Sequence, residues 1–238
     1  MRGIRYQMAK YHFVEEYEAL VTRLMREHPI DRAMEMAVGG SYDQFGAIQA
    51  DILAHVGLQD GQFVFDLGCG SGRLAHALSK RFQINYLGTD VVRSLLQYAA
   101  RKSAKNYIFV LHRQLSVPVP DASVDIACAF SVFTHLLHDE SYLYLEDMRR
   151  ALKPRGRIIF SFLEFGAPAH WRIFEDTVAA QRQSQLPHLN TFIERSAIEV
   201  WSQHLNLSVV EFIDGQDKRW SGQALGQSLV ILEKSTTR

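Results

Sequence analysis

A carboxylate followed by three alternating glycines is the feature of this sequence with the clearest chemistry. Asp66 ends a short apolar run, and Gly68, Gly70 and Gly72 follow it. Glycine has no Cβ, so its backbone can adopt positive φ and approach a ligand at contact distance. Residues 74–78 read as the start of a helix, which presents free N–H groups and a positive dipole end. A strand, a glycine turn and a helix N-terminus together predict a site for a nucleotide-like or carboxylate-bearing ligand.

The glycine spacing and the carboxylate narrow the choice of ligand. A dinucleotide-binding turn has the spacing G-x-G-x-x-G, and its third glycine would fall where this sequence has Arg73. The carboxylate of Asp66 would also repel a diphosphate. A cationic ligand with a free amino group suits this position. S-adenosylmethionine (SAM) carries a sulfonium and an α-ammonium group and no phosphate, so the pattern favours SAM.

Residues 64–78 resemble motif I of the class I SAM-dependent methyltransferases, an acidic residue followed by x-G-x-G-x-G. The resemblance implies an α/β fold with a Rossmann-like, doubly wound, seven-stranded sheet that is mostly parallel. SAM would lie across the carboxyl ends of the central strands. The resemblance implies that Asp66, the three glycines and Arg73 bind the cofactor.

A second acidic residue fits the same cofactor. Residues 85–90 predict a strand that ends in Asp90. Dinucleotide-binding folds place an acid about 20 residues past their glycines, where it binds a ribose hydroxyl. We expect Asp90, with Val91 beside it, to bind the ribose of SAM. A role for Asp90 as the N-cap of the helix that follows is compatible with this function.

The region around adenine departs from the family pattern. Residues 107–111 predict a buried strand, and 117–121 resemble the family's L-P-F-x-D loop. Many members have an Asp five residues before the first proline, which accepts a hydrogen bond from the adenine amino group. This sequence has Arg113 there, followed by Gln114. The amide carbonyl of Gln114 can supply the acceptor, and a backbone carbonyl is the alternative.

The segment after the fourth predicted strand supplies candidates for catalysis. Residues 124–130 predict that strand, and we expect Phe130 at its end to contact the cofactor. Residues 131–136, Ser-Val-Phe-Thr-His-Leu, resemble a subgroup of small-molecule and glycan-pathway methyltransferases, in which this string opens a helix at the active-site mouth. His135 is therefore the first candidate for a general base, and a backbone-bonded histidine at a helix start is the alternative. Glu164 and His170 are further pocket candidates, whereas we expect His112 to be structural and His138 to be solvated. Tyr42 and Phe45 either close over SAM or are ordinary core aromatic residues.

The predicted reaction is methyl transfer from SAM to an oxygen or nitrogen atom of a small-molecule metabolite, by in-line SN2 displacement. The activated methyl group belongs to the cofactor, so the protein contributes mainly positioning, which is worth ~7–11 kcal/mol. A hydroxyl acceptor also needs a general base. Two alternatives are a methyltransferase that acts on protein or RNA, and a non-catalytic module that binds SAM or NAD.

Composition and length agree with an enzyme that acts on small molecules. The chain has 238 residues, enough for one substantial core. Its 26 basic and 26 acidic side chains give a formal net charge of zero, whereas binding to nucleic acid rewards clustered basic residues. We expect a helical cap and substrate lid over residues 1–56, interrupted at 28–29 and 39–41, and a SAM-binding domain over 57–238.

Cysteine usage and hydropathy predict a cytoplasmic protein without a membrane partner. Cys69 and Cys128 have neither disulfide-framework nor metal-site spacing. The first residues lack the apolar core of a signal peptide, and no run approaches the length of a membrane helix. The sequence gives no indication of oligomeric state.

The second half of the chain predicts the rest of the sheet and its helices. A Lys-Pro-Arg-Gly turn at 153–156 separates a helix from a strand. Two strands close the chain with no long helix between them, so they form a hairpin with an antiparallel element at the sheet edge. The predicted helices span 140–152, 169–185 and 193–205, and the predicted strands span 157–162, 207–213 and 227–232.

Overall fold

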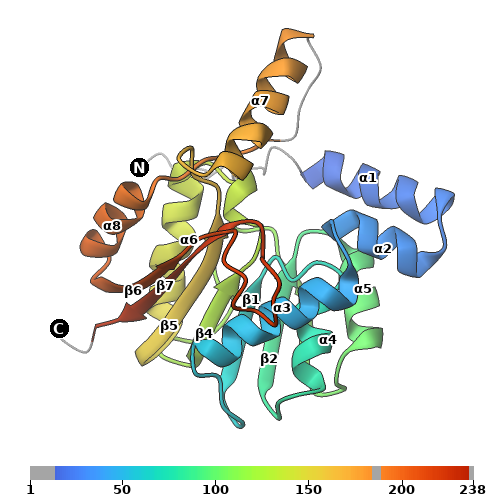
Figure 1. The fold of residues 1–238 in the computed structure, drawn as a ribbon. Helices are drawn as coiled ribbons and strands as arrows, with labels where there is room; N and C mark the ends of the chain where they lie inside the picture. The colour runs from blue at the N-terminus through green and yellow to red at the C-terminus, as the bar shows by residue number, and fades with distance from the viewer. Residues whose placement is uncertain (1–13, 184–188, 236–238) are drawn as a thin grey trace, which may run out of the picture.

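The computed structural model describes residues 14–183 and 189–235, which form one seven-stranded sheet with helices on both faces (Figure 1). The strands are β1 (Phe63–Leu67), β2 (Asn85–Asp90), β3 (Ile108–Leu111), β4 (Val124–Ala129), β5 (Leu152–Phe162), β6 (Leu207–Ile213) and β7 (Ser228–Lys234). Their order is β3-β2-β1-β4-β5-β7-β6. The first five are parallel and β7 is antiparallel to both of its neighbours, which confirms the predicted fold.

The chain reverses direction across the sheet beside β1, because β2 and β3 lie on one side of it and β4 and β5 on the other. Such a switch point opens a crevice at the carboxyl ends of the strands, where ligands bind in doubly wound folds. The glycine turn follows β1 and therefore lies at this crevice.

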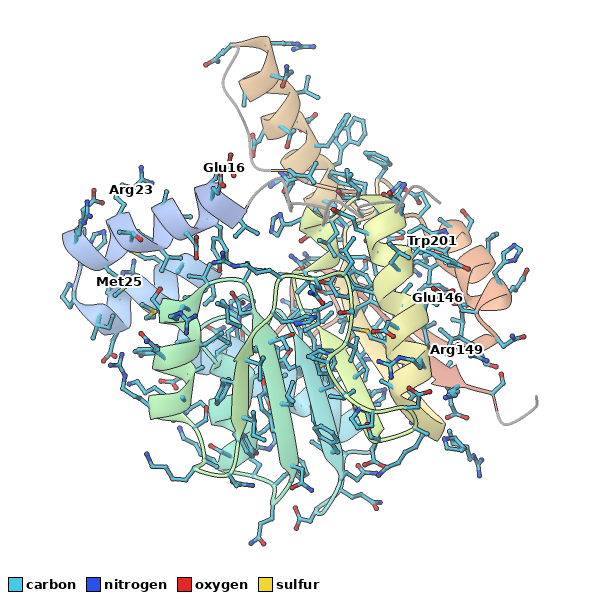
Figure 2. The ribbon with its side chains drawn as sticks, turned by 180° about the vertical axis from the view of Figure 1, so that it is seen from behind. Glu16, Arg23, Met25, Glu146, Arg149 and Trp201 are labelled. Carbon is cyan, nitrogen blue, oxygen red and sulfur yellow. The ribbon has the colours of Figure 1, made fainter. Side chains whose placement is uncertain are left out.

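Helices on both faces explain why the central strands β1 and β4 are mostly apolar and buried. On one face lie α3 (Tyr42–His55), α4 (Arg73–Ser79) and α5 (Arg93–Lys102). The other face is covered by α6 (His138–Ala151) and α8 (Arg195–His204), seen in Figure 2, where Trp201 marks α8. Side chains of β5 alternate between the two cores, with Phe160 packed toward α6 and Ile159 toward α3.

The N-terminal helices break where the sequence predicts. α1 (Val14–Glu27) and α2 (Ile30–Val38) form a hairpin at the carboxyl-end side of the sheet (Figure 1), and α3 follows after the glycines at 39–40. α3 packs closely on α4, because a Cβ on Gly46 would lie 2.5 Å from the carbonyl oxygen of Arg73. Residues 1–13 lie outside the described residues.

The Lys-Pro-Arg-Gly segment interrupts β5 after its first residue and does not connect α6 to the strand. α6 ends at Ala151, and Leu152 already pairs with Val124 of β4. The next pair in register is Ile126 with Arg157, so residues 153–156 loop out of the ladder. Arg155 adopts a left-handed backbone conformation, with φ of +62°, where the chain bends.

One helix projects away from the sheet. α7 (Pro168–Arg182) stands out from the body (Figure 1), and His170 is its one buried residue. At its foot, Trp171 and Phe174 pack against Phe165, and Phe165 stacks on Phe192. The predicted helix extends to residue 185, but 184–188 lie outside the described residues. None of the described helices is long and apolar enough to cross a membrane.

Candidate cofactor and active site

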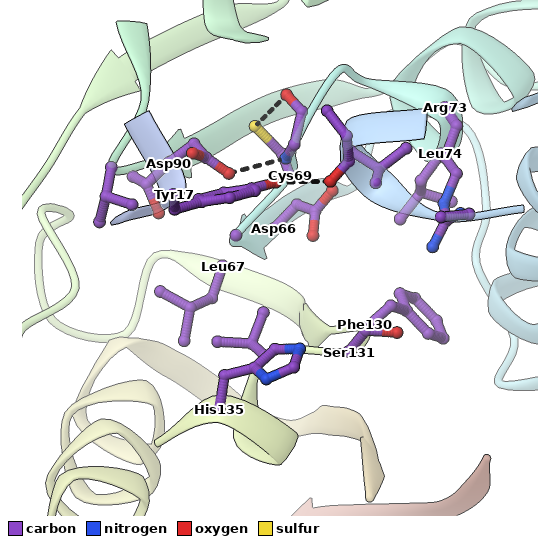
Figure 3. A pocket seen from close by; sticks show the side chains of 18 of the residues that line it. Tyr17, Asp66, Leu67, Cys69, Arg73, Leu74, Asp90, Phe130, Ser131 and His135 are labelled. Carbon is purple, nitrogen blue, oxygen red and sulfur yellow. Dashed lines mark hydrogen bonds between the residues drawn. The ribbon is translucent and has the colours of Figure 1, made fainter. Parts of the chain in front are cut away.

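A cavity of about 420 Å³ opens at the carboxyl ends of the central strands (Figure 3). One wall consists of the ends of β1 and β2 with the glycine turn between β1 and α4. The opposite wall comes from the end of β4 and the short 3-10 helix η1 (Phe133–His135). Residues of α1, α2 and α3 and Leu189 complete the lining.

The glycine turn requires glycine for both conformation and space. Gly68 and Gly70 have φ of +67° and +55°, a region that side-chain-bearing residues rarely adopt. A Cβ on Gly68 would lie 2.4 Å from Cγ2 of Val132, and one on Gly70 would lie 2.7 Å from Cγ1 of Val38. The turn therefore exposes bare backbone to the cavity, between η1 and α2. Gly72, at φ of +82°, is the N-cap of α4.

Asp66 is a buried carboxylate in this wall, with only 3% of its surface exposed. The Tyr86 hydroxyl donates to Oδ2 at 2.5 Å, and the Cys128 thiol donates to Oδ1 at 3.6 Å. Burial raises the pKa of Asp66 to about 7, because the charged form loses its hydration. A cation bound beside Asp66 would reverse this shift.

Asp90 joins the end of β2 to the glycine turn. Its Oδ2 accepts a hydrogen bond from the backbone N–H of Gly70 at 3.0 Å, and its Oδ1 accepts one from Val92 at 2.9 Å. Burial raises the pKa of Asp90 to about 6, and these N–H groups oppose the shift. Each oxygen keeps a lone pair for a ligand hydroxyl. The N-cap of α5 is Val92, so Asp90 is not the cap; it bonds the backbone two residues on.

Arg73 is a buried cation at the start of α4. Its Nη1 donates to the Gly39 carbonyl oxygen at 2.6 Å, and its guanidinium lies over the ring of Phe45, 5.2 Å from the centroid. Burial lowers the pKa of Arg73 to about 10, so it stays charged at neutral pH. Within residues 14–183 and 189–235 no carboxylate pairs with it. Its charge is therefore available to an anionic ligand group.

His135 lines the wall opposite the glycine turn (Figure 3). Its Nδ1 bonds the Leu189 carbonyl oxygen at 2.8 Å. A carbonyl can only accept, so Nδ1 carries the proton in the neutral ring and the lone pair is on Nε2. The backbone-bonded histidine and the general base, which the sequence left as alternatives, are thus compatible.

The adenine region differs from the expectation. Val91, Phe130 and His112 line the cavity, but Gln114 does not. The loop after His112 packs on α6, where the backbone carbonyl oxygen of Gln114 accepts a hydrogen bond at 3.1 Å from the hydroxyl of Tyr144, a residue that lines the cavity. The structure thus does not bring the Gln114 side chain to the cofactor cleft, and a backbone acceptor is the alternative that stays open.

Three other candidates serve the structure. His138 is exposed, and its Nε2 donates to the Phe192 carbonyl oxygen at 2.9 Å. Glu164 forms a bidentate ion pair with Arg195, with both distances 2.9 Å. His170 is buried and accepts from the backbone N–H of Glu164 through Nδ1. None of the three lines the described part of the cavity.

Tyr42 and Phe45 do not line the cavity but contact the glycine turn and Arg73, which form part of its wall. The Tyr42 hydroxyl donates to the Ser71 carbonyl oxygen of the glycine turn at 3.2 Å. Phe45 lies under the Arg73 guanidinium. These aromatic residues hold the turn and Arg73 in place rather than closing over a ligand.

The sequence did not predict the lining residues from the N-terminal helices, of which Tyr17 and Gln49 are the clearest polar examples. Tyr17 of α1 lines the cavity, and its hydroxyl donates to the Ala37 carbonyl oxygen at 3.2 Å. Gln49 of α3 is 2% exposed and has no side-chain hydrogen-bond partner among the described residues. Neither residue belongs to a motif. Only the packing of the N-terminal helices brings them to the cavity.

Comparison with known families places these residues in context. The methyltransferase domain family matches residues 65–160, the segment from β1 to β5 that carries the glycine turn, Asp90 and His135. The chain contains a class I SAM-dependent methyltransferase domain. SAM is the cofactor of this methyltransferase.

Curated relatives of the methyltransferase are distant. The O-methyltransferase rstn1 of Aspergillus nomiae is 26% identical over 168 residues, which is 55% of this chain and 74% of that protein. For two further relatives, the part that aligns with this chain is only 60% and 47% of their own length. The similarity thus spans about half of this chain, and two of these relatives are matched over less than two thirds of their own length.

Solved structures share the whole fold. Magnesium protoporphyrin IX methyltransferase of Synechocystis PCC 6803, solved with bound SAH, has a TM-score of 0.65 and 18% identity, with 93% of this chain and 97% of that chain covered. The [4+2]-cyclase SpnF has a TM-score of 0.67 and 17% identity, with both chains fully covered. At such identities the likeness shows the fold alone.

Proposed function

We propose that this methyltransferase transfers the methyl group of SAM to an oxygen or nitrogen atom of a small-molecule metabolite, by in-line SN2 displacement. The proposal rests on one cavity that joins the glycine turn, two buried carboxylates and His135 (Figure 3). Its volume of about 420 Å³ is in the range of small-molecule sites.

The residues of the cavity fit SAM. The bare backbone of the glycine turn gives room that a Cβ would fill. Asp66 suits the α-ammonium group, and the buried Arg73 suits the α-carboxylate. The remaining lone pairs of Asp90 suit the ribose hydroxyls.

The protein's task is to bind, orient and exclude water. When bound, SAM supplies a methyl group that is already activated on its sulfonium. Tyr17, Leu20 and Met36 cover the cavity from α1 and α2 and limit the access of water. Nε2 of His135 can take the proton of a hydroxyl acceptor, a contribution of about 10²- to 10⁴-fold in rate. An amine acceptor needs only to be neutral.

A small acceptor is favoured over a macromolecule by two observations. The chain has a formal net charge of zero, whereas nucleic acid binding depends on an excess of basic side chains. Two curated relatives, of Pseudomonas fluorescens and Alkalilimnicola ehrlichii, carry the name ubiquinone biosynthesis O-methyltransferase, which points to a small acceptor. Binding to NAD is disfavoured because the carboxylate of Asp66 lies where a diphosphate would have to approach.

Calorimetry followed by isotope labelling tests the proposal. We expect SAM and S-adenosylhomocysteine (SAH) to bind and NAD to fail; binding of NAD alone would refute the assignment. SAM with a deuterated methyl group is then added with a metabolite extract, and labelled products are sought by mass spectrometry. A labelled small molecule supports the proposal. Label confined to protein or RNA would favour a macromolecular acceptor, and binding without transfer would favour a non-catalytic module.

A further inference from the structure

Arg113 stands where many class I methyltransferases have the adenine-binding Asp, and its side chain has a different task here. Nε and Nη2 donate to the carbonyl oxygen of Val91, at 3.0 and 2.8 Å. Nη2 also forms an ion pair with Glu18 of α1. One guanidinium thus joins the loop after β2 to the N-terminal hairpin.

Both partners of Arg113 border the cofactor cavity, one at the end of β2 and the other on α1. Val91 lines it beside Asp90. Glu18 lies between Tyr17 and Leu20, which line the cavity from α1. The ion pair therefore joins α1 to the loop after β2 at the edge of the cavity, next to the residues expected to hold the ribose and adenine.

The other helix of the hairpin is tied to the body of the protein through different contacts. The Tyr98 hydroxyl of α5 donates to Asp31 of α2 at 2.8 Å. The Ser71 hydroxyl donates to the Met34 carbonyl oxygen at 3.3 Å. These bonds fix α2 at the glycine turn and at α5, whereas Arg113 reaches α1 directly.

The geometry points to Arg113 as a positioning residue that holds α1, and with it Tyr17, closed over the bound cofactor. The direct side-chain contact to adenine is replaced by a strap at the edge of the cofactor cavity, in which Arg113 joins Val91 to Glu18 of α1. This inference rests on the proposed use of SAM and adds the means by which SAM is retained.

The strength of the strap suits a site that must exchange SAM for SAH. The Arg113 and Glu18 side chains are 42% and 40% exposed. Exposed ion pairs are weak and are screened by salt. The strap can therefore open in each turnover, and it should act on the rate at which the cofactor leaves.

The test measures dissociation of radiolabelled SAM from the full chain, chased with excess SAH. Glu18→Ala should raise the dissociation rate about 2- to 5-fold, as expected for an exposed pair. Arg113→Ala should raise it about 10-fold or more, because the charge-assisted bonds to Val91 are lost as well. Raising NaCl should accelerate dissociation in the wild type and have little effect in Glu18→Ala.

Matched controls separate the strap from general charge effects. Arg93 of α5 and Glu27 at the end of α1 are exposed, with no side-chain partner among the described residues. Arg93→Ala and Glu27→Ala should leave the rate unchanged. The exchange of charges, Glu18→Arg with Arg113→Glu, should release SAM more slowly than Arg113→Glu alone, because it restores the ion pair, although a glutamate at position 113 cannot donate to Val91. Thermal melting confirms that each variant is folded.

The outcomes separate this inference from the proposed function. If wild-type protein binds no SAM in calorimetry, both are overturned. If SAM binds but Glu18→Ala and Arg113→Ala release it at the wild-type rate, the strap is refuted and the function stands. Faster release in both variants without any recovery in the charge exchange also refutes the strap, because the pair would then have no role as a pair.

Discussion

Ionisation of Asp66 should govern how the affinity for SAM depends on pH. Burial raises the pKa of Asp66 to about 7 in the protein without ligand. An ammonium group bound beside the carboxylate favours its charged form and lowers this pKa. Below pH 7 a proton must therefore leave Asp66 when SAM binds, and the affinity must fall as the pH falls.

The size of the effect follows from the ionised fraction of Asp66. With a pKa of about 7, that fraction is about 0.8 at pH 7.5 and about 0.1 at pH 6. The association constant should therefore fall about eightfold over this range, equivalent to ~1.2 kcal/mol. Asp90, with a pKa of about 6, adds at most about a factor of two at the lower pH.

Calorimetry in two buffers of different ionisation enthalpy measures the protons released. At pH 6.5 we expect about 0.8 proton from Asp66 for each SAM bound, since about that fraction of Asp66 is protonated. Asp66→Asn has no titrating group at this position. It should bind SAM more weakly, by ~1–3 kcal/mol, with a shallower pH dependence.

The same variant has an opposite effect on folding. The pKa of Asp66 is higher in the folded protein than the unfolded value of about 3.9. Stability therefore declines as the pH rises from about 4 to 7, by at most ~4 kcal/mol. Asp66→Asn should raise the melting temperature of the ligand-free protein at pH 8. Equal proton release in wild type and variant, or no gain in melting temperature, would refute the reasoning.

Three further substitutions test the other parts of the site. His135→Ala should lower kcat about 100-fold or more on a hydroxyl acceptor, with the affinity for SAM nearly unchanged. The assay uses the acceptor identified by isotope labelling, and an unchanged kcat would show that His135 is not the general base. Asp90→Ala should weaken SAM binding by ~1–3 kcal/mol in calorimetry, because it loses the ribose contact and the bond from Gly70. Gly70→Ala should cost ~1–3 kcal/mol of stability through its positive φ and its contact with Val38, seen as a lower melting temperature, whereas Gly166→Ala, which meets nothing within 4 Å, should not.

Much of the fold could be predicted because the local pattern and the tertiary environment agree. β6 begins and ends where alternating and apolar residues predict, at Leu207–Ile213. The N-terminal helices break where glycine and proline predict a break. The start of β5 was harder, because Lys153–Gly156 has the residues of a turn. Leu152 before it already pairs with β4, and pairing across a sheet is not encoded locally.

The cofactor half of the site was predictable for a related reason. Its residues lie within a few positions of strand ends, and parallel strands bring those ends to one edge. Gln114 shows the limit of this argument. It lies three residues beyond β3, and the direction of the loop depends on contacts with α6, such as that from Tyr144. The role of Arg113 likewise depends on where α1 packs, which the spacing of motifs does not determine.

The cofactor-binding residues of the cavity lower the stability of the fold more than the residues of the N-terminal helices that cover it. This difference explains why the sequence predicts the cofactor-binding residues and not the covering ones. The buried Asp66, the buried Arg73, which pairs with no carboxylate in the described part of the chain, and the glycines at positive φ are each unfavourable for folding alone. Such exceptions to local rules stand out in a sequence because only a ligand justifies them. The roof of the cavity is formed by side chains such as Tyr17 and Leu20, which any amphipathic helix would carry. We therefore expect acceptor specificity to depend on surfaces whose sequence looks ordinary, including Gln49, which lines the cavity and forms no side-chain hydrogen bond within residues 14–183 and 189–235.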